Sequence, residues 1–164
     1  MSNAQLIGVC GIYCGACLLY RAYKDCDQAL TDYLTNVGIP KEAIRCEGCT
    51  SELISPTCVN CNIRDCAKQK GMAYCYECKE LPCKKLTELS IERAKKDNLP
   101  HLALCIDNLD TLRQIGTEEW LRKQDKRWAC SSCGKKHNWY TEKCSNCGAM
   151  FDNAVKESER KSLK

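Results

Sequence analysis

The chain has 164 residues, 17 of them cysteine, and a formal net charge of +4. No stretch approaches the roughly 20 apolar residues that a membrane-spanning helix needs, so no membrane span is expected. The cysteines are odd in number, come mostly as C-x2-C pairs and follow no apolar signal segment. This pattern argues against a disulfide scaffold and favours reduced, metal-binding thiols in a cytoplasmic protein.

The first cysteines lie in a glycine-rich segment, GVCGIYCGACLLYRA. Cys10, Cys14 and Cys17 could bind one ion there, because glycines allow the tight turns that bring thiolates together. The apolar residues that follow recur at helical spacing and predict a helix to about Val37. Cys26 lies on the apolar face of that helix, where it could be a fourth ligand or a buried thiol.

The spacing of the first three cysteines, C-x3-C-x2-C, also occurs in radical S-adenosylmethionine enzymes. Those enzymes are built on a large partial barrel, and a full barrel of that kind takes roughly 250 residues. This chain has no alternating strand–helix pattern to supply one. We therefore prefer a simpler metal site at these residues.

Eight more cysteines fall within residues 46–83, and the segment CVNCNIRDC recurs 17 residues later as CYECKELPC. Short C-x2-C intervals are typical of metal sites, since two such thiolates can bind one tetrahedral ion. The eight could divide sequentially or in a cross-braced manner, and the sequence leaves both divisions open. The sequential sets are Cys46, Cys49, Cys58 and Cys61, followed by Cys66, Cys75, Cys78 and Cys83.

Helical periodicity continues between and after these cysteines. It predicts helices over residues 63–70, from Pro82 to about Asp97, from Pro100 to Ile115, and from Glu118 to about Lys126. Cys105 lies in the apolar stripe of the third helix. We expect it to be a core cysteine rather than a ligand.

Two C-x2-C-G sequences, Cys130/Cys133 and Cys144/Cys147, form the last cysteine group. Ten residues separate the two pairs, enough for a short hairpin, so we predict a zinc-ribbon β-hairpin here.

The expected fold class is small, metal-stabilised and mainly α, with irregular cysteine-rich loops and a C-terminal zinc-ribbon β-hairpin. We expect a cysteine-rich helical domain at 5–116, a linking helix and zinc ribbon at 117–152, and a disordered tail at 153–164. A chain with one Phe and few aliphatic runs would draw folding free energy from its metals.

Zinc is the default ion for tetrahedral thiolate sites. Setting aside the last four cysteines and Cys105 leaves twelve, which would fill three further sites. If Cys26 is only a buried thiol, eleven remain and one site would be incomplete or differently ligated, so we expect three to four Zn²⁺ ions. An iron–sulfur cluster at the N-terminal sites stays open as the alternative. No H-E-x-x-H motif and no evident carboxylate pair is present. We therefore favour structural metal in an adaptor or binding module over an enzyme. The alternative is a redox protein that uses the N-terminal cysteines.

The basic residues concentrate in the C-terminal third. Residues 120–164 hold 11 Lys and Arg against 5 Asp and Glu, whereas residues 1–119 hold 14 against 16. Basic residues interleaved with Trp128, Trp139 and Tyr140 suit a nucleic-acid partner, and a protein partner is also open. We prefer the alternative that these aromatics form the apolar shield of the zinc site. No small-molecule substrate is indicated.

Several segments together resemble a known family: GVCGIYCGACLLYRA, CVNCNIRDCAKQKG, CYECKELPC and GTEEWLRKQDKRWAC. They resemble a cysteine-rich prokaryotic domain of unknown function with an appended zinc ribbon, and the resemblance extends roughly from Gly8 to Gly148. It implies a metal-binding protein with no established activity. Cys26 and Cys105 do not match its cysteine framework.

Overall fold

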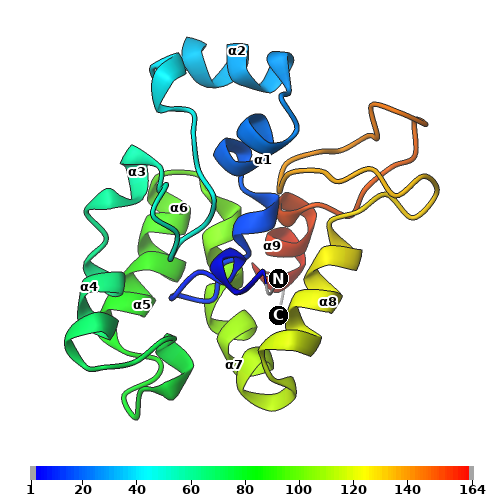
Figure 1. The fold of residues 1–164 in the computed structure, drawn as a ribbon. Coiled ribbons are helices and arrows are strands. Elements are labelled where there is room, and N and C mark those ends of the chain that lie inside the picture. Colours follow the sequence, from blue (N-terminus) through cyan, green and yellow to red (C-terminus); the bar gives the residue numbers. More distant parts are fainter. Residues whose placement is uncertain (1–2, 163–164) are drawn as a thin grey trace.

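The computed structural model of the protein describes residues 3–162, and its ordered elements are short helices joined by irregular loops (Figure 1). The predicted mainly α fold with cysteine-rich loops is confirmed. None of the described helices is long and apolar enough to cross a membrane.

The N-terminal segment contains two helices where the sequence predicts one. The chain breaks at Cys26, whose φ of +50° is incompatible with a continuous right-handed helix. Asp27 then caps a new helix, because its side chain accepts a hydrogen bond from the Leu30 amide at 3.0 Å. The elements are η1 (Ala4–Leu6), η2 (Cys14–Ala16), α1 (Leu18–Lys24) and α2 (Gln28–Asn36).

The central third alternates cysteine loops with short helices. The helix predicted over 63–70 is present as α4, and the one predicted from Pro82 runs without a break through α5, η5 and α6, with a π-helical turn in its middle. The elements are η3 (Lys41–Ala43), α3 (Pro56–Val59), α4 (Asn62–Gln69), η4 (Cys75–Glu77), α5 (Lys84–Thr87), η5 (Glu88–Arg93) and α6 (Ala94–Lys96).

The C-terminal third begins with two helices separated by Gly116, whose φ of +77° ends the first of them. The segment expected to be a disordered tail differs from that expectation. It forms a helix whose first residue, Ala154, is fully buried, while residues 163–164 lie outside the described part of the chain. The elements are η6 (Pro100–Leu104), α7 (Cys105–Ile115), α8 (Thr117–Arg127) and α9 (Ala154–Ser162).

The main core forms around the N-terminal segment, which lies among α7, α8 and α9 (Figure 1). Ile7, Leu109 and Trp120 are fully buried, and the Tyr13 ring meets Trp120 edge-to-face with centroids 5.9 Å apart. A Cβ on Gly11 would lie 2.5 Å from the Cys105 carbonyl oxygen. The first cysteine loop is therefore packed directly against the start of α7.

The predicted zinc-ribbon β-hairpin is wrong, since residues 3–162 contain no strand. Only isolated bridges flank the two cysteine pairs, Ala129 with Lys136 and Lys143 with Met150. Between them, Trp139 uses its amide to donate to the Ala16 carbonyl at 3.0 Å, and its carbonyl accepts from the Ala154 amide at 2.9 Å. Because these backbone groups bond to other segments, they cannot form the ladder that a hairpin needs.

Candidate metal centre

The side chains of Cys130, Cys133, Cys144 and Cys147 converge at the C-terminal loops. All four Sγ atoms lie within 4.8 Å of one another. The Sγ atoms of Cys130 and Cys147 are 3.5 Å apart, and those of Cys133 and Cys144 are 3.6 Å apart. A tetrahedral zinc with Zn–S bonds of about 2.3 Å requires sulfur separations of about 3.8 Å. The four thiols therefore have the spacing of a single thiolate-bound ion.

Two loops of the same construction hold these thiols. The Cys130 amide donates to the Lys135 carbonyl at 2.8 Å, and the Cys144 amide donates to the Ala149 carbonyl at 2.8 Å. Gly134 and Gly148 turn each loop with φ values of +74° and +77°, which glycine adopts at no steric cost. In both loops the first cysteine is buried and the second is exposed. The loops project from the helical body (Figure 1).

The electrostatics of the loops favour a thiolate at Cys133. Hydrogen bonds from the Asn146 side chain and the Lys135 backbone lower the pKa of Cys133 to about 6. A thiolate is the form that binds metal. The donor set and its spacing thus fit a thiophilic ion such as Zn²⁺.

Aromatic rings close the inner side of the site. The His137 ring stacks on Phe151 with centroids 3.6 Å apart and meets Trp128 edge-on at 5.7 Å. Nδ1 of His137 lies 3.2 Å from the Asn138 carbonyl oxygen. His137 is thus part of the apolar packing beside the site. Trp128 and Trp139 are also buried, so their ring faces are not available to stack on bases.

The N-terminal segment anchors the other cysteine loops through its backbone. The Cys49 amide donates to the Gln5 carbonyl at 2.9 Å, and the Cys75 amide donates to the Val9 carbonyl at 2.9 Å. A Cβ on Gly48 would lie 2.1 Å from the Gln5 oxygen, so only glycine permits this approach. These contacts bring cysteines far apart in the sequence to one region of the fold.

Burial strongly affects the thiols in that region. Burial, with smaller contributions from neighbouring cysteines, raises the pKa of Cys17 to about 12, of Cys49 to about 11 and of Cys75 to about 12. Cys105 donates a hydrogen bond to Cys10, which lowers the pKa of Cys10 and raises that of Cys105. Grouped thiols of this kind become thiolates most readily when a cation compensates their charge.

The structure groups these N-terminal cysteines less tightly than the C-terminal four. Within residues 3–162, no other set of three cysteine, histidine or acidic side chains has all its ligand atoms within 4.8 Å. Cys46 lies in a small apolar cluster with Leu19, Leu34 and Ile44, and Cys58 is exposed. Metal binding by the remaining N-terminal cysteines stays a prediction. The remaining ones are Cys10, Cys14, Cys17, Cys26, Cys46, Cys49, Cys58, Cys61, Cys66, Cys75, Cys78 and Cys83.

The structure gives Cys26 and Cys105 contrasting environments. Cys26 is exposed at the turn between α1 and α2, where its thiol donates to the Tyr23 carbonyl at 3.9 Å. Cys105 is fully buried, as expected of a core cysteine, but its thiol contacts Cys10. Spacing could not indicate that contact, because it depends on how α7 packs against the first loop.

A pocket of about 420 Å³ brings four of the central cysteines together. Cys66, Cys75, Cys78 and Cys83 all line it. This is the second of the two sequential sets that the spacing allows.

Comparison with known proteins places the chain in a family. The model of a family described as "Protein of unknown function (DUF3795)" matches residues 6–88, which are 83 of the 164 residues. The match covers the first cysteine loop and the central cysteines and ends before the C-terminal four. No curated protein and no solved structure matches the chain. The chain belongs to the DUF3795 family of proteins of unknown function.

Proposed function

We propose that the protein is a metal-binding adaptor in which a zinc ion at Cys130, Cys133, Cys144 and Cys147 holds two projecting loops in shape for a macromolecular partner. The observation that carries this proposal is the convergence of four Sγ atoms within 4.8 Å. Four thiolates leave no coordination position open, which is typical of structural rather than catalytic zinc.

Metal analysis tests the zinc site directly. The full chain should contain one more zinc ion than the Cys133→Ser variant, and the variant should keep its helical circular dichroism, because the thiol is exposed and outside the core. Ser131→Ala is the matched control, since it also changes an exposed side chain of the same loop but removes no predicted ligand, and it should keep the full zinc content. Equal zinc in wild type and Cys133→Ser would contradict the proposal.

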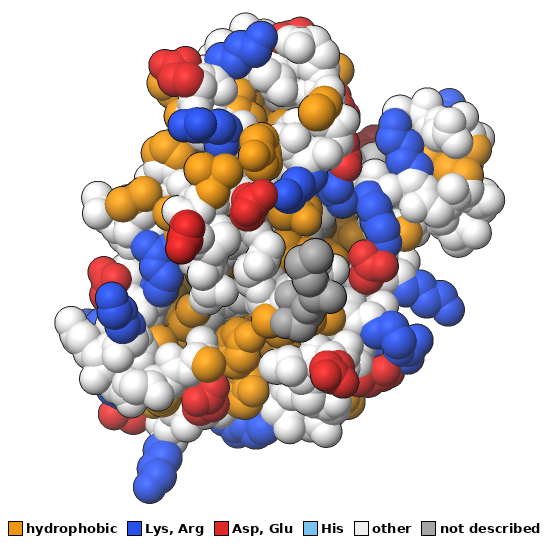
Figure 2. All heavy atoms as spheres, viewed as in Figure 1, with side chains coloured by type: hydrophobic (Ala, Val, Ile, Leu, Met, Phe, Trp, Pro, Cys, Tyr) orange, Lys and Arg blue, Asp and Glu red, His pale blue; other side chains and the backbone are white. Residues whose placement is uncertain are grey.

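A nucleic-acid backbone is the partner that we propose for the loops. Many cations of the C-terminal third are neutralised within the fold: Arg122 and Lys123 by Glu119, and Lys136 by Asp125. Lys135 and Lys143 are exposed on the loops, and among the described residues neither has an ion pair. Basic side chains lie on the projecting loops, and basic and acidic side chains lie side by side over the adjoining helix (Figure 2). Since the tryptophans are buried, binding would depend on phosphate charge rather than on base stacking.

Binding to labelled single-stranded and double-stranded oligonucleotides at several salt concentrations tests this partner. The double variant Lys135→Glu/Lys143→Glu should bind more weakly and lower the slope of log K against log salt by about 1–2, since each phosphate contact contributes about 0.7–0.9. Lys41→Glu/Lys95→Glu makes the same charge change at exposed lysines elsewhere and serves as the control. Equal loss in both variants, or no binding at low salt, would favour a protein partner instead.

A further inference from the structure

The pocket between α4 and α5 has a composition suited to a metal cofactor. Four thiols line it, together with the apolar side chains of Ile63, Met72, Leu81 and Leu86. Its volume is about 420 Å³, whereas one zinc ion with four thiolates fills its own site and needs no cavity. The pocket is thus larger than a single ion requires.

The spacing of the thiols also differs from that of a single-ion site. At the C-terminal site all four Sγ atoms lie within 4.8 Å, but no three of the pocket's Sγ atoms do so. A single tetrahedral zinc needs its sulfurs about 3.8 Å apart. An iron–sulfur cluster accepts wider spacing, because its thiolates bind separate iron atoms around an inorganic core.

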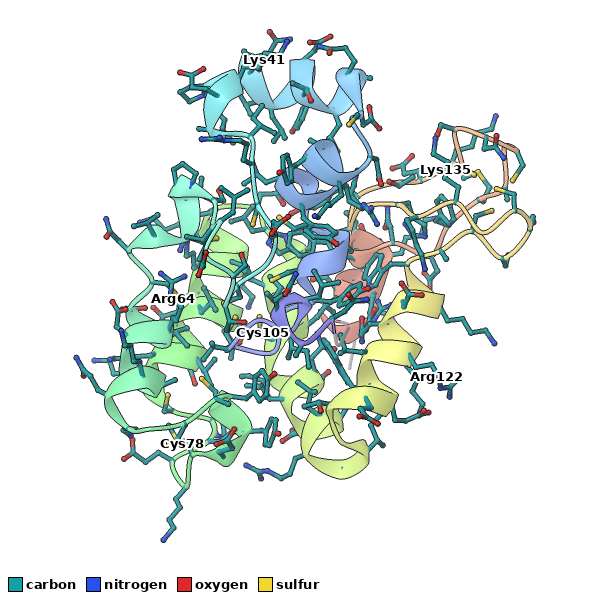
Figure 3. All side chains as sticks on the ribbon, in the orientation of Figure 1. Lys41, Arg64, Cys78, Cys105, Arg122 and Lys135 are labelled. Atoms are coloured by element: carbon teal, nitrogen blue, oxygen red, sulfur yellow. The ribbon has the colours of Figure 1, made fainter. Side chains whose placement is uncertain are left out.

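The four cysteines come from three places in the chain around the pocket. Cys66 lies on α4, Cys75 begins η4, Cys78 follows it and Cys83 immediately precedes α5. Cys78 lies in the loop region below α4 (Figure 3). The Cys75 amide is bonded to the Val9 carbonyl, which fixes this wall of the pocket to the N-terminal segment. The thiols therefore surround the hollow rather than meet at one point.

Positive charge lies at the same place. Lys70 Nζ is 3.7 Å from the Cys78 Sγ and 3.1 Å from a Glu80 carboxylate oxygen. Lys84 and Lys85 also line the pocket, as do Glu80 and Glu88. Four thiolates carry net negative charge into the site, and hydrogen bonds to sulfur are among the interactions that set the potential of a cluster. Lys70 is positioned to provide such a bond.

We propose that Cys66, Cys75, Cys78 and Cys83 bind an iron–sulfur cluster in this pocket, through one thiolate each. The cluster is a second cofactor, separate from the zinc at the C-terminal loops. The two sites share no ligand, so each can be removed without the other.

The test uses the full chain, purified without oxygen and reconstituted with ferrous iron, sulfide and a thiol reductant. Wild type should bind iron and acid-labile sulfide in equal amounts and absorb broadly in the visible. Cys83→Ser should lose at least about two iron atoms and two sulfides per chain, the content of the smallest four-cysteine cluster, and keep its C-terminal zinc. Cys133→Ser should lose zinc and keep the iron, and Ser131→Ala should keep both.

A second variant covers the case in which Cys83→Ser does not fold. Cys78→Ser is milder for the fold, because Cys78 follows η4 in a loop. It should keep the fold and change the absorption and the electron paramagnetic resonance spectrum of the reduced protein. Wild type that binds no iron, pocket variants that lose zinc instead of iron, or an unchanged spectrum in Cys78→Ser would each overturn the proposal.

Discussion

The Trp139 ring stacks on the His101 ring, with centroids 4.0 Å apart and planes inclined by 7°. Trp139 lies midway between the two cysteine loops, and His101 lies in η6, which precedes α7. The backbone of Trp139 is bonded on one side to Ala16 and on the other to Ala154. The segment between the two halves of the metal centre is therefore fixed in the helical body.

Replacing Trp139 with alanine should destabilise the whole protein. The side chain is buried in the main core, and removing a buried aromatic costs about 3–5 kcal/mol. Urea unfolding should show this loss, and Trp139→Phe, which keeps a ring against His101, should lose less. If Trp139→Ala loosened only the cysteine loops and left the urea midpoint unchanged, the anchoring role would be contradicted.

His101 should make stability fall as the pH falls below 6.5. Burial lowers the pKa of His101 from 6.5 to about 3, so between these values the unfolded chain binds the extra proton and the folded chain does not. Stability therefore rises with pH in this window and is lost towards acid. Between pH 7 and pH 5 the loss due to His101 should be about 2 kcal/mol.

His101→Phe is the control that isolates this effect. It keeps a ring against Trp139 but cannot titrate, and it loses the hydrogen bond that His101 Nδ1 shares with the Tyr140 hydroxyl. The variant should start less stable at pH 7 by about 1 kcal/mol. Loss of metal in acid lowers the stability of both wild type and His101→Phe. The difference between their slopes of stability against pH therefore reports on His101. Parallel slopes would show that His101 is not the titrating group.

Much of the helical pattern could be predicted from the sequence, because it depends on local periodicity. The helices at α4, through α5–α6 and at α7–α8 lie close to their predicted ranges. The break at Cys26 could not be found in this way, since the apolar spacing continues through it. It depends on the capping of α2 by Asp27.

The C-terminal site shows both the strength and the limit of spacing arguments. Two C-x2-C-G sequences identified all four cysteines, because each local loop brings its own pair of thiols together. The hairpin was wrong because the residues between the loops bond to Ala16 and Ala154, which lie far away in the sequence. The contact of Cys105 with Cys10 and the grouping of the four pocket thiols likewise depend on tertiary packing, which cysteine spacing does not reveal.

Cys105→Ser should be far more harmful than Cys26→Ser. The Cys105 thiol is fully buried and bonded to Cys10, whereas the Cys26 side chain is exposed. We expect Cys105→Ser to lower stability by about 1–3 kcal/mol, since it places a more polar hydroxyl in a site shaped for a thiol. Cys26→Ser should stay within about 0.5 kcal/mol of wild type. Calorimetry and metal analysis of both variants would check this, and metal loss in Cys26→Ser would instead identify Cys26 as a ligand.

Gly11→Ala should disrupt the contact between the first cysteine loop and α7. Its φ is +87°, and a Cβ there would lie 2.5 Å from the Cys105 oxygen and 2.7 Å from the Leu109 Cγ. Gly38→Ala is the matched control, because its φ is +94° and a Cβ there would meet nothing within 4 Å.

Both glycine variants should lose the roughly 1–2 kcal/mol that a left-handed backbone costs a residue with a Cβ. Gly11→Ala should lose roughly 1–3 kcal/mol more, because overpacking displaces α7. Equilibrium unfolding in urea of both variants measures the difference. Since Cys105 and Cys10 meet at this contact, Gly11→Ala should also reduce the metal content of the N-terminal cysteines while leaving the zinc at Cys130–Cys147 in place. Equal losses of stability in the two variants would mean that the first loop is not held against α7.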